Sequence, residues 1–190
     1  MNFNEVSFEF AAGTVKQLPQ SDIPEIVFSG HSNVGKSSLY NRLVGREAAI
    51  VTDIEGTTRD ILQESVTVGG QVTLRLYDTA GLREASDAVE RIGIDRARAA
   101  MDEAELIVAV FDGSRALSEG EIALIDDLTR RAKAGQTVLP VLNKSDLAAG
   151  VDLSALAPLG EAVMLSAATG EGMDALSARI CEMFVDGQID

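Results

Sequence analysis

Short apolar segments alternate along this chain with segments whose apolar residues recur every three or four positions. The short segments are rich in β-branched and aliphatic residues, which is typical of strands that are buried on both faces of a sheet. The predicted strands are Glu25–Ser29, Ile61–Val68, Val72–Tyr77, Leu106–Phe111, Thr137–Leu142 and Ala162–Ser166. The predicted helices are Lys36–Leu43, Ile92–Met101, Ser118–Ala134 and Glu171–Phe184.

This alternation predicts an α/β fold with a mostly parallel sheet of six strands and helices on both faces. Gly69-Gly70 joins two of the predicted strands. Two glycines suit a tight hairpin turn, so we expect one antiparallel strand at the edge of the sheet. We expect a single domain at residues 25–190, preceded by an N-terminal arm at residues 1–24, which glycine and proline interrupt.

Charge and composition exclude several function classes. The formal net charge is −14 at pH 7 and the sequence pI is about 4.4, whereas surfaces that bind nucleic acid or anionic lipid carry clustered Lys and Arg. Nucleic-acid binding by this chain alone and a direct membrane contact are therefore not expected. Cys181 is the only cysteine, so no internal disulfide can form. The N-terminal residues lack the basic region and apolar run of a secretory leader. No apolar stretch reaches the roughly 18 residues needed to span a bilayer. We expect a cytoplasmic protein.

The segment GHSNVGKS at Gly30–Ser37 fits the phosphate-binding pattern G-x-x-x-x-G-K-[ST] between a predicted strand and a predicted helix. In that context backbone N–H groups cradle phosphates, Lys36 reaches the β and γ oxygens, and Ser37 binds magnesium. The predicted phosphate-binding residues are Gly30, Asn33, Val34, Gly35, Lys36, Ser37 and Ser38. His31 is expected to point outward, because the backbone makes the phosphate contacts. The alternative is a glycine-containing turn with an exposed lysine.

Three further motifs follow predicted strands, and ligands bind at the carboxyl ends of strands in such sheets. Asp78-Thr79-Ala80-Gly81 offers Asp78 to magnesium and a Gly81 N–H to a γ-phosphate. Asn143-Lys144-Ser145-Asp146 predicts guanine selectivity, since a buried Asp146 carboxylate accepts from N1–H and the 2-amino group and adenine offers neither donor. Ser166-Ala167 would add a backbone N–H to guanine O6. Each motif by itself is also compatible with a solvated turn.

The four motifs in this order resemble those of the P-loop GTPases of the translation-factor-related class, over residues 25 to about 184. The stretch GREAAIVTDIEGTTRD from Gly45 and the stretch DTAGLREASDAVERIGIDRA from Asp78 closely resemble the G domain of the MnmE (TrmE) family of tRNA-modification GTPases, over about residues 42–190. Residues 1 to about 40 instead resemble the start of the EngB/YsxC/YihA ribosome-assembly GTPases, whose PGKT-type switch is absent here. The chain therefore resembles a mosaic, either a constructed chimera or a recombined protein.

The MnmE resemblance implies which residues bind cations and promote hydrolysis. In that family a potassium ion beside the phosphates takes the place of an arginine finger, and Leu82 cannot orient the attacking water as the glutamine of many GTPases does. The implied catalytic residues are Asn33, Lys36, Arg59 and Glu90, of which Glu90 orients the water and Arg59 contacts a dimer partner. The implied potassium ligands are Asn33, Thr52, Ile54 and Thr57, and the implied magnesium ligands are Ser37, Thr58 and Asp78; Thr57 and Thr58 also contact the nucleotide. Without the resemblance, we would interpret the segment that contains Thr52, Ile54, Thr57 and Thr58 as a flexible solvated loop. Glu90 would be a residue that stabilises a helix N-terminus.

These implications predict an enzyme that converts GTP to GDP and phosphate with Mg²⁺ and K⁺. It would form a transient homodimer through its switch regions, which are Gly45–Asp60 and the segment that begins at Asp78. The family role is modification of the tRNA wobble uridine, which needs a folate-binding and helical module and a tRNA-modification partner protein. This chain alone is therefore not expected to modify tRNA. Two alternatives stay open: an EngB-like GTP-dependent switch in ribosome assembly, and an ATPase or small-molecule kinase, against which the Asn143–Asp146 motif argues.

Overall fold

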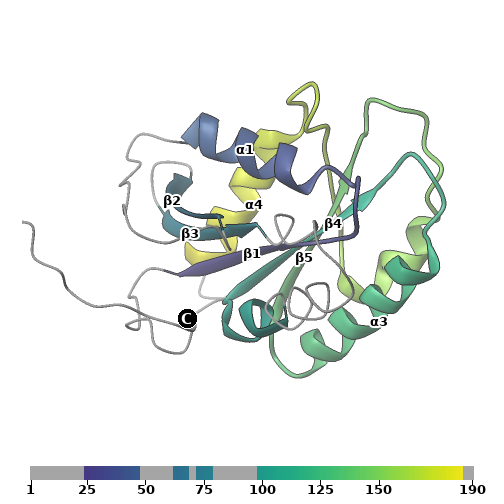
Figure 1. The fold of residues 1–190 in the computed structure, drawn as a ribbon, viewed down its shortest axis with the longest axis horizontal. Helices are drawn as coiled ribbons and strands as arrows, with labels where there is room; N and C mark the ends of the chain where they lie inside the picture. Colours follow the sequence, from purple (N-terminus) through teal and green to yellow (C-terminus); the bar gives the residue numbers. More distant parts are fainter. Residues whose placement is uncertain (1–23, 48–61, 69–71, 79–97, 186–190) are drawn as a thin grey trace, which may run out of the picture.

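The computed structural model describes residues 24–47, 62–68, 72–78 and 98–185 of the 190-residue chain. Six strands in these residues form one sheet in the order β2-β3-β1-β4-β5-β6 (Figure 1). The strands are β1 (Glu25–Ser29), β2 (Leu62–Val68), β3 (Val72–Asp78), β4 (Leu106–Asp112), β5 (Thr137–Asn143) and β6 (Val163–Met164). Every neighbouring pair is parallel except β2 and β3, which confirms the predicted antiparallel edge strand.

The helices cover both faces of the sheet, as predicted. In Figure 1, α1 (Lys36–Glu47) and α4 (Met173–Val185) lie on one side of the sheet and α3 (Glu119–Lys133) lies on the other. Successive strand residues point to opposite faces, so Ile26 and Phe28 of β1 join a buried cluster with α1 and α4, whereas Val27 joins a cluster with α3. The buried apolar helix residues are Leu39, Tyr40, Leu43, Met173, Leu176, Ile180 and Met183 in the first cluster and Ala100, Met101, Ile125, Leu128, Leu156 and Leu159 in the second.

The start of α3 is fixed by a capping box. Ser118 is the N-cap, its hydroxyl accepts a hydrogen bond from the Glu121 N–H, and the Glu121 carboxylate accepts one from the Ser118 N–H. This exchange satisfies N–H groups that a helix start leaves unpaired. Ala134 is the C-cap. The predicted helix Ser118–Ala134 therefore matches α3 with both of its caps.

Other element boundaries differ from the predictions. Helix α1 continues four residues past Leu43, and the predicted strand Ala162–Ser166 is only Val163–Met164. The strand ends early because the Ser166 N–H donates to the Glu171 carbonyl in a turn. A 3-10 helix, η3 (Leu153–Leu159), packs against α3 and was not predicted.

Several predictions concern residues outside the described part. The N-terminal arm except Pro24 and the Gly69-Gly70 turn lie outside the described residues. The start of the helix predicted from Ile92 lies outside them too, and the described residues 98–103 are helical. The division into an arm and a domain stays a prediction. Among the described residues, no helix is long and apolar enough to cross a membrane.

The second buried cluster can be tested on α3. Leu128 is fully buried, and Leu128→Ala is expected to lower the free energy of unfolding by about 2–5 kcal/mol, because it removes buried methyl groups and leaves a cavity. Ile122 lies on the same helix with half of its surface exposed, so Ile122→Ala should stay within about 0.5 kcal/mol of the parent. Urea unfolding followed by circular dichroism measures both. Equal costs for the two variants would contradict this packing.

Candidate nucleotide-binding site

The four sequence motifs meet at one edge of the sheet. Gly30 follows β1, Asp78 is the last residue of β3, Asn143 is the last residue of β5, and Ser166 lies two residues beyond β6. These strands run in the same direction, so their carboxyl ends share an edge. The chain builds the sheet outward from β1 in both directions, and such a switch in strand order is where open α/β sheets bind ligands.

The phosphate loop, residues Gly30–Ser37, turns tightly into the first turn of α1. The Lys36 ammonium donates a hydrogen bond of 2.6 Å to the Gly30 carbonyl, which bends the loop around its own lysine. A Cβ atom on Gly30 would lie 2.4 Å from the Val110 carbonyl oxygen, so the loop can pass over β4 only with glycine at this position. Asn33 is exposed and has a left-handed backbone with φ of 63°.

Asn143 joins three loops through one buried carboxamide. Its Nδ2 donates to the Val34 carbonyl of the phosphate loop at 2.8 Å, and its Oδ1 accepts from the Ala167 N–H at 2.8 Å. Asn143 is only 3% exposed. A Cβ atom on Gly35 would lie 2.3 Å from this Nδ2. The amide therefore locks the phosphate loop, the base-recognition turn (Asn143–Asp146) and the loop after β6 (Ser166–Glu171) in one arrangement.

Arg42 also supports the loop after β6, through two backbone carbonyls. Its Nε donates to the Ala167 carbonyl at 2.6 Å, and its Nη2 donates to the Ala168 carbonyl at 2.7 Å. Arg42 lies on α1, which begins in the phosphate loop. One rigid helix thus connects the phosphate side of the site to the base side.

Two predicted features of the site are wrong in this structure. Asp146 is exposed rather than buried, because the base-recognition turn projects beyond the sheet edge, where the Leu147 N–H closes it on the Lys144 carbonyl. His31 does not point outward: it is half-buried, and a Cβ atom on Gly120 would lie 2.5 Å from its Cε1. The imidazole therefore packs against the first turn of α3.

The N–H groups proposed for guanine O6 both have acceptors within the protein. The Ser166 N–H donates to the Glu171 carbonyl at 2.9 Å, and the Ala167 N–H donates to Asn143 Oδ1. A bond from either group to guanine would be shared with these acceptors.

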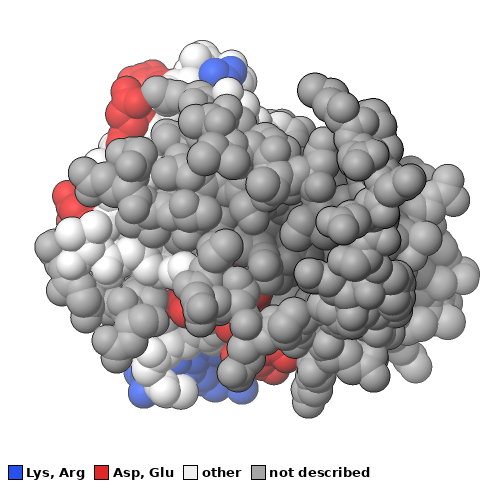
Figure 2. Space-filling view, turned by 90° about the vertical axis from the view of Figure 1, so that its left-hand side faces the viewer, with Lys and Arg blue, Asp and Glu red and all other residues white. Residues whose placement is uncertain are grey.

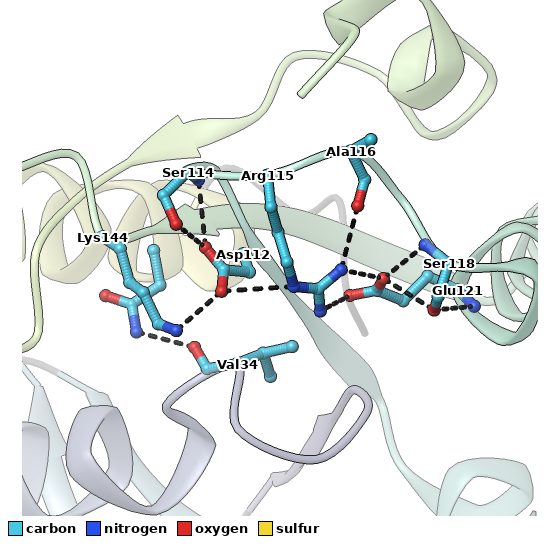
Figure 3. A network of polar contacts seen from close by, with 9 residues as sticks. Val34, Asp112, Ser114, Arg115, Ala116, Ser118, Glu121 and Lys144 are labelled. Carbon is cyan, nitrogen blue, oxygen red and sulfur yellow. Dashed lines mark hydrogen bonds and ion pairs between the residues drawn. The ribbon is translucent and has the colours of Figure 1, made fainter. Parts of the chain in front are cut away.

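Figure 3 shows a polar network that begins at the base-recognition turn. The Lys144 ammonium donates to Asp112 Oδ2 at 2.6 Å, and Asp112 Oδ1 accepts from the Ser114 N–H and hydroxyl at 3.0 and 2.6 Å. Arg115 Nε lies 3.5 Å from Asp112 Oδ2. Asp112 ends β4 and stands directly opposite Asn143 of β5, which places its carboxylate beside the turn.

The network continues to the start of α3. Two guanidinium nitrogens of Arg115 donate to the two carboxylate oxygens of Glu121, at 2.8 and 3.0 Å. Glu121 is completely buried and also accepts from the Ser118 N–H and hydroxyl. Paired, bidentate bonds of this kind are what allow a carboxylate to be buried.

These contacts set the ionisation of both carboxylates. Burial raises the pKa of Glu121, but hydrogen bonds from Arg115 and Ser118 outweigh it, so the pKa lies below its ordinary value. Burial likewise opposes ionisation of Asp112, and hydrogen bonds from Lys144 and Ser114 outweigh it and lower its pKa. Both groups are thus held as carboxylates at neutral pH.

Most described cations are engaged with acceptors. Lys144, Arg115, Arg130, Arg131 and Arg179 form ion pairs with carboxylates. In the face that Figure 2 shows, the blue and red side chains of described residues lie next to each other at the lower edge, and no continuous basic stripe crosses the described atoms. The described surface in this view therefore offers no extended site for a nucleic-acid backbone.

Some predicted site residues lie outside the described part: Thr52, Ile54, Thr57, Thr58, Arg59, Gly81, Leu82 and Glu90. Sequence reasoning missed Arg42, Asp112, Arg115 and Glu121. The S-x-x-E spacing of the capping box was a readable signal for Glu121, and the end of a buried strand was one for Asp112. Arg42 carries no local signal, because its partners are more than a hundred residues away in the sequence.

The lowered pKa values predict acid sensitivity. A carboxylate whose pKa is lower in the folded state adds stability above its ordinary pKa of about 4, and this stability is lost as the pH falls through the folded pKa. We expect the free energy of unfolding to fall below about pH 4, and Glu121→Gln to flatten this dependence. Glu119→Gln, an exposed site in the same helical turn, is the control that should keep it. Chemical denaturation at a series of pH values measures the slopes, and identical slopes in all three proteins would contradict the role of Glu121.

Comparisons with known proteins agree with this geometry. A family model described as 50S ribosome-binding GTPase matches residues 25–144. Similar curated relatives are the tRNA modification GTPases MnmE of Lacticaseibacillus paracasei, 45% identical over 161 residues, and of Listeria welshimeri, 46% identical over 164 residues. These matches cover 83% and 85% of this chain but 34% and 35% of the relatives. The chain thus spans about a third of the length of the relatives it matches.

Solved structures share the fold. An Era variant from Aquifex aeolicus bound to GDP.AlF4- has a TM-score of 0.62 and 23% identity, over 83% of this chain and 56% of that one. The G domain of the FeoB iron transporter from T. maritima has a TM-score of 0.61 and 26% identity, over 84% of this chain and 98% of that one. Because the family model matches more than half of the chain, the protein belongs to the 50S ribosome-binding GTPase family and is a GTP-hydrolysing enzyme with a P-loop G-domain fold.

Proposed function

We propose that this chain is an MnmE-like G domain whose GTP hydrolysis is stimulated by K⁺ and coupled to the association of two G domains. The observation that carries the proposal is the Asn143 carboxamide, which holds the phosphate loop, the base-recognition turn and the loop after β6 in one site. The identity of about 45% to MnmE proteins supports an MnmE-like mechanism over other GTPase mechanisms.

The phosphate loop and the base-recognition turn have separate tasks in this proposal. Backbone N–H groups of the loop and the Lys36 ammonium hold the β and γ phosphates. Lys36 would exchange its bond to the Gly30 carbonyl for phosphate oxygens without moving far, since both lie within the same loop. The Asp146 carboxylate accepts from guanine, and its exposure leaves both oxygens accessible to a base from solvent.

The described residues fit the cations that the mechanism needs. Ser37 is exposed in the first turn of α1, and Asn33 is exposed within the phosphate loop. Hydroxyl, carboxylate and amide oxygens are ligands for hard cations, so we assign Ser37 and Asp78 to Mg²⁺ and Asn33 to K⁺. From the MnmE resemblance we add Thr58 to the Mg²⁺ ligands, and Thr52, Ile54 and Thr57, largely through backbone carbonyls, to the K⁺ ligands. When bound, the two cations supply positive charge for phosphoryl transfer.

The remaining steps belong to the switch residues. Leu82 has no hydrogen-bonding group with which to orient water, so we assign the water-orienting role to Glu90 and a contact across the dimer to Arg59. Association of two G domains would order the loops that carry these residues, which is an order–disorder switch. This ties turnover to protein concentration.

The tRNA role extends beyond this chain. The MnmE relatives are about three times as long as the part that matches, and we infer that wobble-uridine modification requires a folate-binding and helical module and a partner protein. The G domain alone would hydrolyse GTP without modifying tRNA.

The cation dependence provides the test. GTP hydrolysis is measured at several protein concentrations in KCl and in NaCl of equal ionic strength. We expect turnover to be about tenfold or more faster in K⁺, equivalent to about 1.4 kcal/mol of transition-state stabilisation, and to rise with protein concentration. Asn33→Ala should remove the K⁺ effect. Asn41→Ala changes the same residue type at an exposed position of α1 and should keep it. Equal rates in both salts, or a K⁺ effect that survives in Asn33→Ala, would refute the mechanism.

A ribosome-associated switch is the second candidate, favoured by the description of the family model as 50S ribosome-binding. In this case the nucleotide state would direct association with the large subunit and hydrolysis would reset it. The net charge of −14 and the engaged cations argue against a broad contact with ribosomal RNA. Co-sedimentation with 50S particles in GTP but not in GDP would favour this function.

A further inference from the structure

We propose that Asp112 is a positioning residue for guanine-nucleotide binding: it holds the Lys144 side chain of the base-recognition turn in place before the nucleotide arrives. The inference rests on the proposed guanine role of this turn and adds a residue to it that no sequence motif includes.

Lys144 adopts a conformation that needs support. Its φ is 68°, and the only other described non-glycine residue with a positive φ is Asn33 in the phosphate loop. A left-handed backbone is unfavourable for a residue with a long side chain and persists where surrounding contacts hold it. The 2.6 Å charged hydrogen bond from its ammonium to Asp112 Oδ2 is such a contact.

Asp112 is itself firmly fixed. Only 4% of its surface is exposed, and Ser114 donates two hydrogen bonds to its Oδ1. Arg115 approaches Oδ2 from the side opposite the turn and is held by the buried Glu121 (Figure 3). The carboxylate therefore cannot follow Lys144 if the turn shifts, so it acts as a fixed anchor rather than as one half of a mobile ion pair.

An anchored turn affects nucleotide affinity because Asn143 precedes Lys144 directly. The Asn143 carboxamide binds both the phosphate loop and the loop after β6. A turn that is ordered before binding avoids the entropy loss of ordering it on binding. We therefore expect Asp112 to act on nucleotide affinity, and on KM more than on kcat.

The test is a double-mutant cycle read by GDP affinity, measured by calorimetric titration of the complete chain with Mg²⁺. Asp112→Asn is expected to raise the Kd for GDP about tenfold, a typical size for interactions within one network. Lys144→Met should weaken binding at least as much. The double variant should be no weaker than Lys144→Met alone, because Asp112 acts through Lys144. A purely structural role of Asp112 would instead give additive effects.

Two further variants keep the test decisive. Asp127→Asn is the matched control: it removes ion pairs of 2.9 and 3.0 Å to Arg130 and Arg131 on α3 and should leave the Kd unchanged. Ser114→Ala loosens Asp112 without removing its charge, so it should raise the Kd by about two- to threefold even if Asp112→Asn folds poorly.

The outcomes separate this inference from the proposed function. If Lys144→Met raises the Kd for GDP while Asp112→Asn and Ser114→Ala leave it unchanged, the positioning role of Asp112 is overturned and the guanine role of the turn stays intact. Additive effects in the double variant would also overturn it. No effect of Lys144→Met would overturn the inference alone, because guanine recognition is assigned to Asp146, whereas equal Kd values for GDP and ADP in the parent chain would refute the guanine role of the turn.

Discussion

The site depends on a single buried amide. Asn143 ends β5, an interior parallel strand of the sheet. Burying the two polar atoms of its side chain would cost free energy if they had no hydrogen-bond partners. One atom is satisfied by the Val34 carbonyl and the other by the Ala167 N–H. Because both partners are backbone groups of loops, the requirement to satisfy one side chain fixes the spacing of the phosphate loop, the base-recognition turn and the loop after β6. A nucleotide site follows from that spacing, since the N–H donors for the phosphates and the carboxylate acceptor for the base lie on different loops and must keep a constant separation.

Two supports keep this arrangement rigid. On one face of the sheet, α1 begins in the phosphate loop and carries Arg42, whose guanidinium binds two carbonyls of the loop after β6. On the other face, the start of α3 packs against His31 of the phosphate loop and reaches Lys144 through Glu121, Arg115 and Asp112. Each face of the sheet therefore connects the phosphate side of the site to the base side. A planar guanidinium suits both tasks, because its nitrogens can bind two acceptors at once.

The fold was largely predictable because the buried strands are nearly continuous apolar segments, so their number, their order along the chain and the helices between them could be inferred. Residues of the phosphate loop and of the base-recognition turn could be named because their spacing carries a mechanism. Burial of Asp146 and the direction of His31 were predicted wrongly, since both depend on what packs beside a turn, which no local pattern encodes. The contacts of Arg42 and Asp112 were not predicted for the same reason, because their partners lie 125 and 32 residues away in the sequence.

The central claim is that these loops form a site selective for guanine nucleotides. Calorimetric titration of the chain with GDP and with ADP, each with Mg²⁺, tests it most directly. We expect GDP to bind at least about tenfold more tightly than ADP, because guanine offers two hydrogen-bond donors to the Asp146 carboxylate and adenine offers neither. Equal affinity for the two nucleotides would contradict guanine selectivity, because the base-recognition turn would then play no part in recognising the base.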